Sequence, residues 1–238
     1  MRTGIVSGLL FEARAVVGKA AEAGRALPHP SGQTWVQVAG IGPERARAAA
    51  ESLIAQQGVE VLLSWGTCAG LVAGVSSGAL VVPRQIRSGS GTILETDPGL
   101  QAALVRALGD LADVKETPLA EATEVVESVR AKQALAERSG AAAVDMESAA
   151  VARVAREAGV AFVAVRAVID PHDQALPKAV LALSDAYGRI RWSRLPGCAL
   201  RHGRTLGRLA RQSSRATRTL TTVAAPVRTQ LEAWAPSG

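Results

Sequence analysis

Cysteine and aromatic residues are scarce in this chain of 238 residues. The two cysteines, Cys68 and Cys198, lie far apart and in no metal-ligand spacing. This argues against a structural zinc site and against a disulfide framework, and it suits a reducing cytoplasm. Aromatic residues make up only 3% of the chain, whereas alanine, valine and leucine are abundant. We therefore expect an aliphatic core.

Acidic residues are almost absent from the last part of the chain. Ten arginines and no acid lie between Arg189 and Arg228. Residues 1–188 hold 17 basic and 20 acidic residues, and residues 189–238 hold 10 and 1. The acidic body and the basic tail therefore need separate explanations. We expect a domain over residues 1–180 and an arginine-rich helical extension over residues 181–238.

Charge is also missing from a run of 23 residues between Val61 and Pro83. Length alone would suggest a membrane-spanning helix. Four glycines interrupt the run together with serines and a threonine, so we interpret it as a strand, a glycine-rich turn and a second strand. Near the N-terminus, Glu12 and Arg14 interrupt the apolar stretch, and we therefore expect no signal peptide.

Strand-like and helix-like patterns alternate along the body. The expected strands are residues 3–7, 34–38, 59–65, 79–82, 141–145 and 160–169, and the expected helices are 12–23, 43–57, 100–111, 131–139 and 148–158. Residues 84–97 should be loop, and 121–127 strand or loop. Alternation with short links favours a single-domain α/β fold with three layers, in which helices cover both faces of a central mixed or mostly parallel sheet.

Two acidic residues follow predicted strands. Glu147 comes shortly after the apolar run that ends at Val144, and Asp170 ends the apolar run that begins at Val163. In open α/β sheets, ligands bind in the crevice at the carboxyl ends of the strands. We expect Glu147 and Asp170 to face one crevice, where one acid could bind a sugar and the other donate a proton. Taken singly, each is also explained as a helix-start acid or a turn residue.

Two further segments have both structural and functional interpretations. Glu12 follows the first predicted strand, where the helix dipole favours an acid. The sequence Gly66-Thr67-Cys68-Ala69-Gly70 follows a buried strand. A glycine turn there would present backbone N–H groups to an anion or a sugar hydroxyl, although such turns also serve only to reverse the chain.

In combination, these motifs resemble a known superfamily. The chain resembles the nucleoside phosphorylases and nucleosidases in the order of its motifs: Glu12, the glycine turn, Met146-Glu147 and Arg166-Ala167-Val168-Ile169-Asp170. Each of these motifs also resembles that of the methylthioadenosine/S-adenosylhomocysteine nucleosidases. The segment from Asp170 to Pro177 and the arginine-rich tail look more like the hopanoid-associated phosphorylase branch, to which removal of adenine from adenosylhopane is ascribed. The resemblance implies a phosphorylase-like fold and cleavage of the N-glycosidic bond of an adenine nucleoside, with adenosylhopane favoured.

The resemblance also implies roles for individual residues. Asp170 would protonate N7 of the leaving purine, from a partly desolvated site that keeps its proton near neutral pH. Glu147 would bind the ribose hydroxyls, and Met146 would pack on the sugar face. Glu12 would activate a water below C1′. The remaining expected site residues are Thr67 and Arg166, which would assist Glu12, Gly66 beside them, and Val125 and Val126 near the base.

The nucleophile is open between water and phosphate. Related phosphorylases hold phosphate with an arginine just before the glycine turn, and Leu63-Ser64-Trp65 contains none. This favours hydrolysis without a cofactor or metal, although Arg14 and Arg166 leave phosphate open as a co-substrate. The alternatives are a methylthioadenosine/S-adenosylhomocysteine nucleosidase, a purine nucleoside phosphorylase, or a catalytically silent protein that binds a nucleoside or tethers partners to a membrane.

The tail contains two periodic sets of residues. The basic set is Arg201, Arg204, Arg208, Arg211, Arg215 and Arg218, and the weakly apolar set is Leu206, Leu209, Ser213, Ala216, Leu220, Val223 and Val227. On a helix they form two stripes, which is typical of a helix on an anionic membrane surface. The competing interpretation is a helix that covers the domain. No aromatic residue is interleaved with the arginines, which argues against specific nucleic-acid binding. The resemblance also implies a homo-oligomer, and we expect the protein to be in the cytoplasm. If the tail binds a membrane, the protein would lie at the inner membrane surface.

Overall fold

The computed structural model describes residues 1–176, 182–190, 193 and 195–235. One mixed sheet is formed by β1 (Thr3–Ser7), β2 (Ala26–Pro28), β3 (Thr34–Val38), β4 (Val61–Gly70), β5 (Leu80–Val81), β6 (Gln85–Arg87), β7 (Ile93–Glu95), β8 (Val114–Lys115), β9 (Leu119–Glu121), β10 (Ala143–Asp145) and β11 (Ala161–Asp170). The helices are α1 (Leu10–Val17), α2 (Pro43–Gln57), α3 (Pro98–Leu108), α4 (Val129–Ser139), α5 (Ser148–Ala158) and α7 (Leu195–Ala233), with a 3₁₀ turn at Gly18–Ala20.

Strand β4 is the centre of the sheet. Its first part lies between β1 and β11 and runs parallel to both. Its last two residues, Ala69 and Gly70, pair with the antiparallel β10. The strand order is β2-β3-β1-β4-β10-β9-β6-β7, and β11, β5 and β8 continue from β4 on a second branch. The carboxyl ends of β4 and β11 therefore meet beside the short strand β10.

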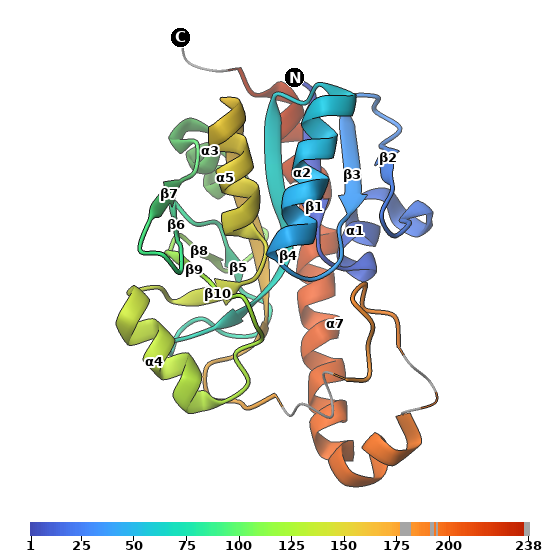
Figure 1. Ribbon diagram of the computed structural model, residues 1–238, viewed down its shortest axis with the longest axis vertical. Helices are drawn as coiled ribbons and strands as arrows, with labels where there is room; N and C mark the ends of the chain where they lie inside the picture. The colour runs from blue at the N-terminus through green and yellow to red at the C-terminus, as the bar shows by residue number, and fades with distance from the viewer. Residues whose placement is uncertain (177–181, 191–192, 194, 236–238) are drawn as a thin grey trace.

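Successive residues of the central strands point to opposite faces of the sheet. Leu62 and Ala164 belong to the core beneath α2 and α5, whereas Leu63 and Val163 belong to the core beneath α1, α3 and α7. Figure 1 shows these helices in layers on the two sides of the sheet. The buried hydrophobic residues are almost all aliphatic. These findings confirm the predicted three-layer α/β/α fold with a mixed sheet and an aliphatic core.

The long helix α7 forms part of this core. From Ala216 onward its apolar residues, among them Leu220 and Val227, are buried against the sheet. At its other end the helix extends beyond the rest of the domain and bends at His202, whose dihedral angles are not helical (Figure 1). The predicted boundary between the domain and the C-terminal extension, at residues 180 and 181, stays a prediction, because both residues lie outside the described ones. Pro177, the last residue of the segment from Asp170 to Pro177, also lies outside them.

Three predictions about local structure are wrong. The segment Gly66–Gly70 is not a turn but the second half of β4, because it pairs with β10 and β11. Residues 84–97 are not a loop throughout, since β6 and β7 form an antiparallel pair there. The first helix begins at Leu10 and ends at Val17, where Gly18 adopts a φ of 64° and its N–H bonds back to Arg14.

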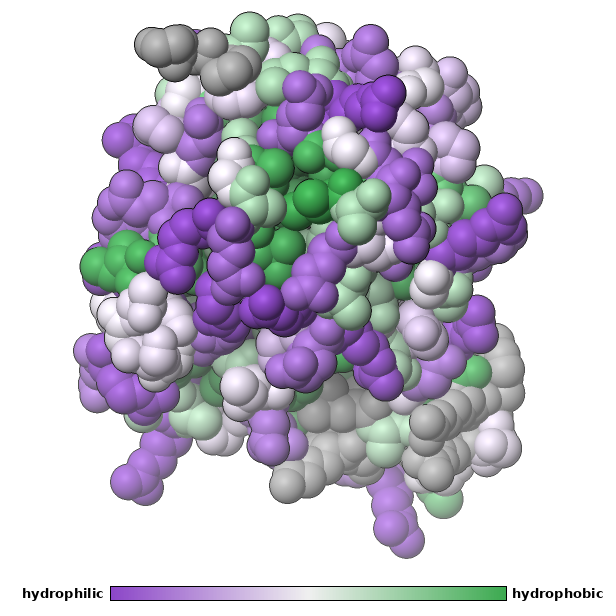
Figure 2. Space-filling view, turned by 45° about the horizontal axis from the view of Figure 1, so that its top comes forward, coloured by the Kyte–Doolittle hydropathy of each residue, from purple (hydrophilic) through white to green (hydrophobic). Residues whose placement is uncertain are grey.

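The uncharged run from Val61 to Pro83 contributes two strands, β4 and β5, as the sequence predicts. Within the part of the chain that the structure describes, no helix has the length and apolar character needed to cross a membrane. Hydrophilic residues cover much of the face shown in Figure 2, and the largest group of hydrophobic residues lies near its centre. Two of the exposed large hydrophobic residues, Val125 and Ile190, line the cavity described next.

Candidate active site

A cavity of about 630 Å³ lies beside the carboxyl ends of β4, β10 and β11. Seven of the nine predicted site residues line it: Glu12, Thr67, Val125, Val126, Met146, Glu147 and Asp170. The other two, Gly66 and Arg166, lie directly behind Glu12. The structure therefore brings all the predicted site residues into one region, and the expected common crevice for Glu147 and Asp170 is present.

The carboxylate of Glu12 is held by four hydrogen bonds. Its Oε1 accepts from the backbone N–H and the hydroxyl of Thr67, at 2.8 and 2.7 Å, and its Oε2 accepts from the Leu9 N–H and the Ser7 hydroxyl, at 2.9 and 3.1 Å. Burial raises the pKa of Glu12, and the positive charge of Arg166 and the hydrogen bonds oppose this effect. The result is an acid fixed in position, with a pKa above that of an exposed glutamate.

Gly66 provides the space that this arrangement requires. A Cβ at this position would lie 2.6 Å from Glu12 Oε2 and 2.8 Å from Arg166 Nη1. Carbon and oxygen atoms cannot approach so closely without displacement. Gly66 therefore allows the side chains of Glu12 and Arg166 to lie close to the strand. It does not form the turn that the sequence predicts.

Arg166 is buried behind the acids and is already engaged. Its Nη2 forms an ion pair with Asp145 Oδ2 at 2.7 Å and donates to the Ser64 hydroxyl at 2.5 Å, and its Nε donates to the Ser148 hydroxyl at 3.2 Å. Its Nη1 lies 3.6 Å from Glu147 Oε2. Sequence reasoning missed Asp145, although it shares a motif with Glu147. The guanidinium charge is compensated by Asp145 inside the protein.

Glu147 stands just before α5 and opposite Glu12. Its Oε1 accepts a hydrogen bond of 3.0 Å from the Gly42 N–H. A Cβ on Gly8 would lie 3.5 Å from Glu147 Oε1 and 3.7 Å from Glu12 Oε2, so the two acids flank the same glycine. Burial raises the pKa of Glu147 to about 7. The positive charge of Arg166 opposes this rise, and the negative charge of Asp145 adds to it. Glu147 therefore titrates near neutral pH.

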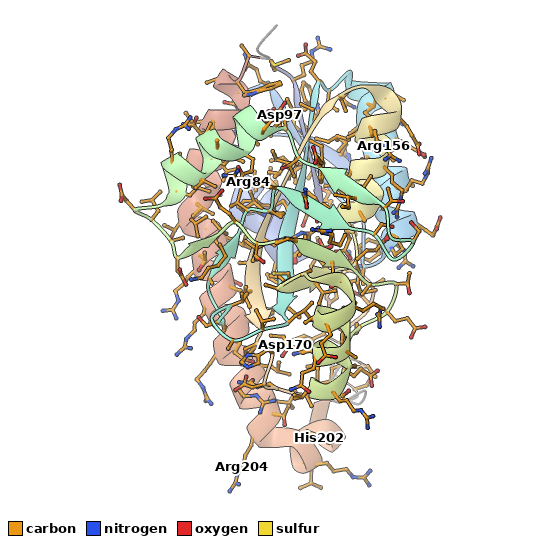
Figure 3. All side chains as sticks on the ribbon, turned by 90° about the vertical axis from the view of Figure 1, so that its left-hand side faces the viewer. Arg84, Asp97, Arg156, Asp170, His202 and Arg204 are labelled. Atoms are coloured by element: carbon orange, nitrogen blue, oxygen red, sulfur yellow. The ribbon has the colours of Figure 1, made fainter. Side chains whose placement is uncertain are left out.

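Asp170 approaches the cavity from β11. The register of β11 against β4 shifts between Val168 and Asp170, and such irregularities redirect the side chains that follow them. Figure 3 shows Asp170 in the half of the molecule toward His202 and Arg204, which mark the projecting end of α7. Asp170 Oδ2 accepts a hydrogen bond of 2.7 Å from the buried Lys132. Burial raises the pKa of Asp170, and Lys132 opposes the rise.

Helix α7 contributes a largely apolar wall to the cavity. The residues of α7 that line it are Leu206, Leu209, Ala210, Ser213 and Thr217. The sequence predicted Leu206, Leu209 and Ser213 to lie on an apolar stripe but gave no sign that the stripe faces a ligand cavity. Most arginines of the other stripe are exposed, and Arg204 points away from the body in Figure 3.

Comparisons with known proteins agree with this fold. Residues 23–186 match the model of the phosphorylase superfamily, so the protein belongs to that superfamily, as its motifs predict. The futalosine hydrolase of Helicobacter pylori superposes with a TM-score of 0.72 at 18% sequence identity, over 98% of each chain. No curated protein sequence matches the chain.

Two nucleosidase structures are similar to the same extent. The 5′-methylthioadenosine/S-adenosylhomocysteine nucleosidase of Helicobacter pylori, solved with butyl-thio-DADMe-Immucillin-A, has a TM-score of 0.71 and 18% identity over 98% of this chain and 99% of that one. The corresponding enzyme of Campylobacter jejuni has a TM-score of 0.73 and 15% identity over 98% of this chain and 100% of that one. These matches confirm the phosphorylase-like fold.

Proposed function

We propose that the protein is a nucleosidase that hydrolyses the N-glycosidic bond of an adenine nucleoside. The observation that carries the proposal is that Glu12, Glu147 and Asp170 line one cavity at the strand ends of a phosphorylase-superfamily fold. The similar structures of methylthioadenosine/S-adenosylhomocysteine nucleosidases support the same activity. A catalytically silent nucleoside-binding protein would not require three buried acids, each with a raised pKa.

In this mechanism the three acids have separate tasks. Asp170 gives its proton to N7 of adenine while the bond between C1′ and N9 breaks and its electron pair passes to the base. Glu147 accepts hydrogen bonds from the ribose hydroxyls as positive charge develops at C1′. Glu12 takes a proton from the water that attacks C1′. Met146 packs on the sugar, and Val125 and Val126 lie beside the base.

The surroundings of the arginines favour water over phosphate as the nucleophile. Arg166 is 1% exposed and its charge is compensated by Asp145, and Arg14 is exposed on α1 without lining the cavity. A phosphate ion beside C1′ would meet the carboxylates of Glu12 and Glu147, which repel it. Adenine release that does not depend on phosphate tests this choice.

The apolar part of the cavity favours a substrate with a bulky apolar 5′ group, and we propose adenosylhopane. Beyond the acids the lining consists mainly of apolar residues, including Ile169, Ile190 and Leu209. The second candidate is methylthioadenosine or S-adenosylhomocysteine. The structural similarity to the nucleosidases named for these two substrates supports it. Both candidates share the adenosine part and differ in the group that would contact α7.

A tryptophan at Leu209 tests which 5′ group the cavity accepts. Leu209→Trp should lower kcat/KM for adenosylhopane about tenfold or more, because overpacking costs roughly 1–3 kcal/mol. It should change kcat/KM for methylthioadenosine by less than about threefold, because a methylthio group leaves the far wall unfilled. The matched control is Leu200→Trp, at an exposed position on the same helix. Equal losses for both substrates in Leu209→Trp would contradict the proposed binding mode.

We also propose that the protein is a cytoplasmic homo-oligomer and that α7 attaches it to an anionic membrane surface. This attachment would bring the active site to a membrane-borne substrate. The exposed arginines of the helix are Arg201, Arg204, Arg211, Arg215 and Arg218, whereas Arg208 donates to the Ala175 carbonyl. The apolar stripe is occupied by the core and the cavity, so the attraction would be electrostatic and about 1 kcal/mol for each arginine.

Sedimentation with lipid vesicles tests this attachment. The protein should sediment with vesicles that contain phosphatidylglycerol and remain in solution with pure phosphatidylcholine, and about 0.5 M salt should release it. Arg201→Gln combined with Arg204→Gln should weaken binding roughly thirtyfold, at about 1 kcal/mol for each charge. The control is Arg25→Gln with Arg45→Gln, which removes two exposed arginines away from α7. Binding that is equal for both lipids would contradict the proposal.

A further inference from the structure

Lys132 on α4 is wholly buried, which is uncommon for a lysine. Its ammonium donates to Asp170 Oδ2 at 2.7 Å, to the Pro171 carbonyl at 2.7 Å and to the Gln174 carbonyl at 2.9 Å. An ammonium has three donors, and all three are used. The ion pair with Asp170 compensates its charge, since an unpaired buried charge is strongly unfavourable.

The same contact bears on the proton that Asp170 is proposed to deliver. Because Lys132 occupies Oδ2, the transferable proton is left to Oδ1. Once the proton has moved to the base, the new carboxylate lies 2.7 Å from a positive charge inside the protein. A cation at this distance stabilises the carboxylate more than the neutral acid, so proton transfer becomes more favourable.

We propose that Lys132 is a positioning residue for the general acid, which orients Asp170 through Oδ2 and sets its strength as a proton donor. The proposal rests on the nucleosidase function. In each turnover, Asp170 Oδ1 gives its proton to N7 of the leaving adenine and a proton from water restores it, while Lys132 keeps its own protons. The lysine thus acts through Asp170 and does not touch the reacting atoms.

Other charged groups face Asp170 less directly. Arg208 from α7 favours the carboxylate, Asp173 from the following segment opposes it, and Glu124 from the segment after β9 lines the same cavity. Lys132 donates a hydrogen bond directly to Asp170, whereas these groups act at longer range. Removal of Lys132 should therefore change the titration of Asp170 more than removal of any of the others.

The test is the pH dependence of kcat/KM for adenine release in Lys132→Met. Loss of the ammonium favours the neutral acid, so the pKa of Asp170 should rise and the alkaline limb of the profile should move upward by about one pH unit or more. Below this limb, kcat should fall about 10- to 100-fold because the acid is weaker and less well oriented, and KM should change less than about threefold. Lys132→Arg keeps the charge, and its limb should stay near that of the wild type.

The matched control is Lys115→Met, which removes a lysine whose ion pair with Asp113, 2.8 Å long, lies at the surface. Its profile should be unchanged. In the Asp170→Asn background, Lys132→Met should cause little further loss of kcat, since both changes act on the same step. If Lys132→Met does not fold, Lys132→Gln, which keeps a hydrogen-bond donor without the charge, gives the same test.

Infrared difference titration of the Asp170 carboxyl group, with Asp170→Asn as the reference, separates this proposal from the proposed function. If the wild type releases no adenine, the nucleosidase function fails, and the titration still reports whether Lys132 controls Asp170. An upward shift of the carboxyl titration in Lys132→Met or Lys132→Gln is expected. A folded variant in which neither the titration nor the alkaline limb moves would overturn the proposal and leave Lys132 a purely structural residue.

Discussion

Asp170→Asn is expected to lower kcat for adenine release by about 10²- to 10⁴-fold. An amide of nearly the same shape cannot give up a proton to N7, so adenine would have to leave as a poorly stabilised anion. The amide also leaves the buried Lys132 without its counter-charge, and the variant should unfold at a lower temperature than the wild type. Rates should therefore be compared at a temperature where both proteins are folded.

Binding separates a chemical defect from a structural one in this variant. A non-cleavable adenine nucleoside analogue should bind Asp170→Asn within about tenfold of its affinity for the wild type, because the acid acts mainly in the transition state. Asp173→Asn, at an exposed acid three residues away, is the matched control and should retain nearly full activity. Unchanged adenine release in Asp170→Asn would exclude Asp170 as the acid.

Glu12→Gln is expected to cause a similar loss, about 10²- to 10⁴-fold in kcat, when water is the nucleophile. Glutamine cannot accept the proton of the attacking water. It would also turn an NH₂ group toward donors that now bond to a carboxylate, either those of Thr67 or those of Leu9 and Ser7. The matched control is Glu22→Gln, which removes an exposed acid from the segment after α1 and should have no effect.

The pH dependence of the wild type gives an independent check on Glu12. A base is active when deprotonated, and burial raises the pKa of Glu12. Activity should therefore be lost as the pH falls through a value above the ordinary pKa of glutamate near 4.3. This acidic limb should disappear from the residual activity of Glu12→Gln. An unaltered acidic limb in that variant would assign it to another group, such as Glu147, which flanks the same glycine.

The positions of the catalytic candidates could be predicted because their signal is local. An apolar run that ends in an acid predicts a strand with the acid at its carboxyl end, and this holds for Asp170 directly and for Glu147 two residues after β10. Glycine is more ambiguous, since it serves both turns and close contacts. The sequence around Gly66 predicts a turn, because the residues that approach this glycine, Glu12 and Arg166, are distant in the sequence.

Interactions between distant segments explain what the sequence did not reveal. Lys132 stands in a helix rich in charged residues, where a lysine normally faces solvent, and its partner Asp170 is 38 residues away. The ion pair between Asp145 and Arg166 likewise depends on how β10 and β11 flank β4. The periodicity of α7 predicts a helix with one apolar side, but periodicity alone does not say whether that side meets a membrane, a core or a cavity.

The central claim is tested most directly by adenine release from adenosylhopane by the purified wild-type protein in phosphate-free buffer. Chromatography would follow adenine and the sugar product together, with methylthioadenosine as the parallel substrate. The account predicts release of adenine and of the unphosphorylated sugar at a rate that added phosphate does not change. Release that requires phosphate and yields a sugar phosphate would contradict hydrolysis, and no release from either substrate would contradict the nucleosidase function itself.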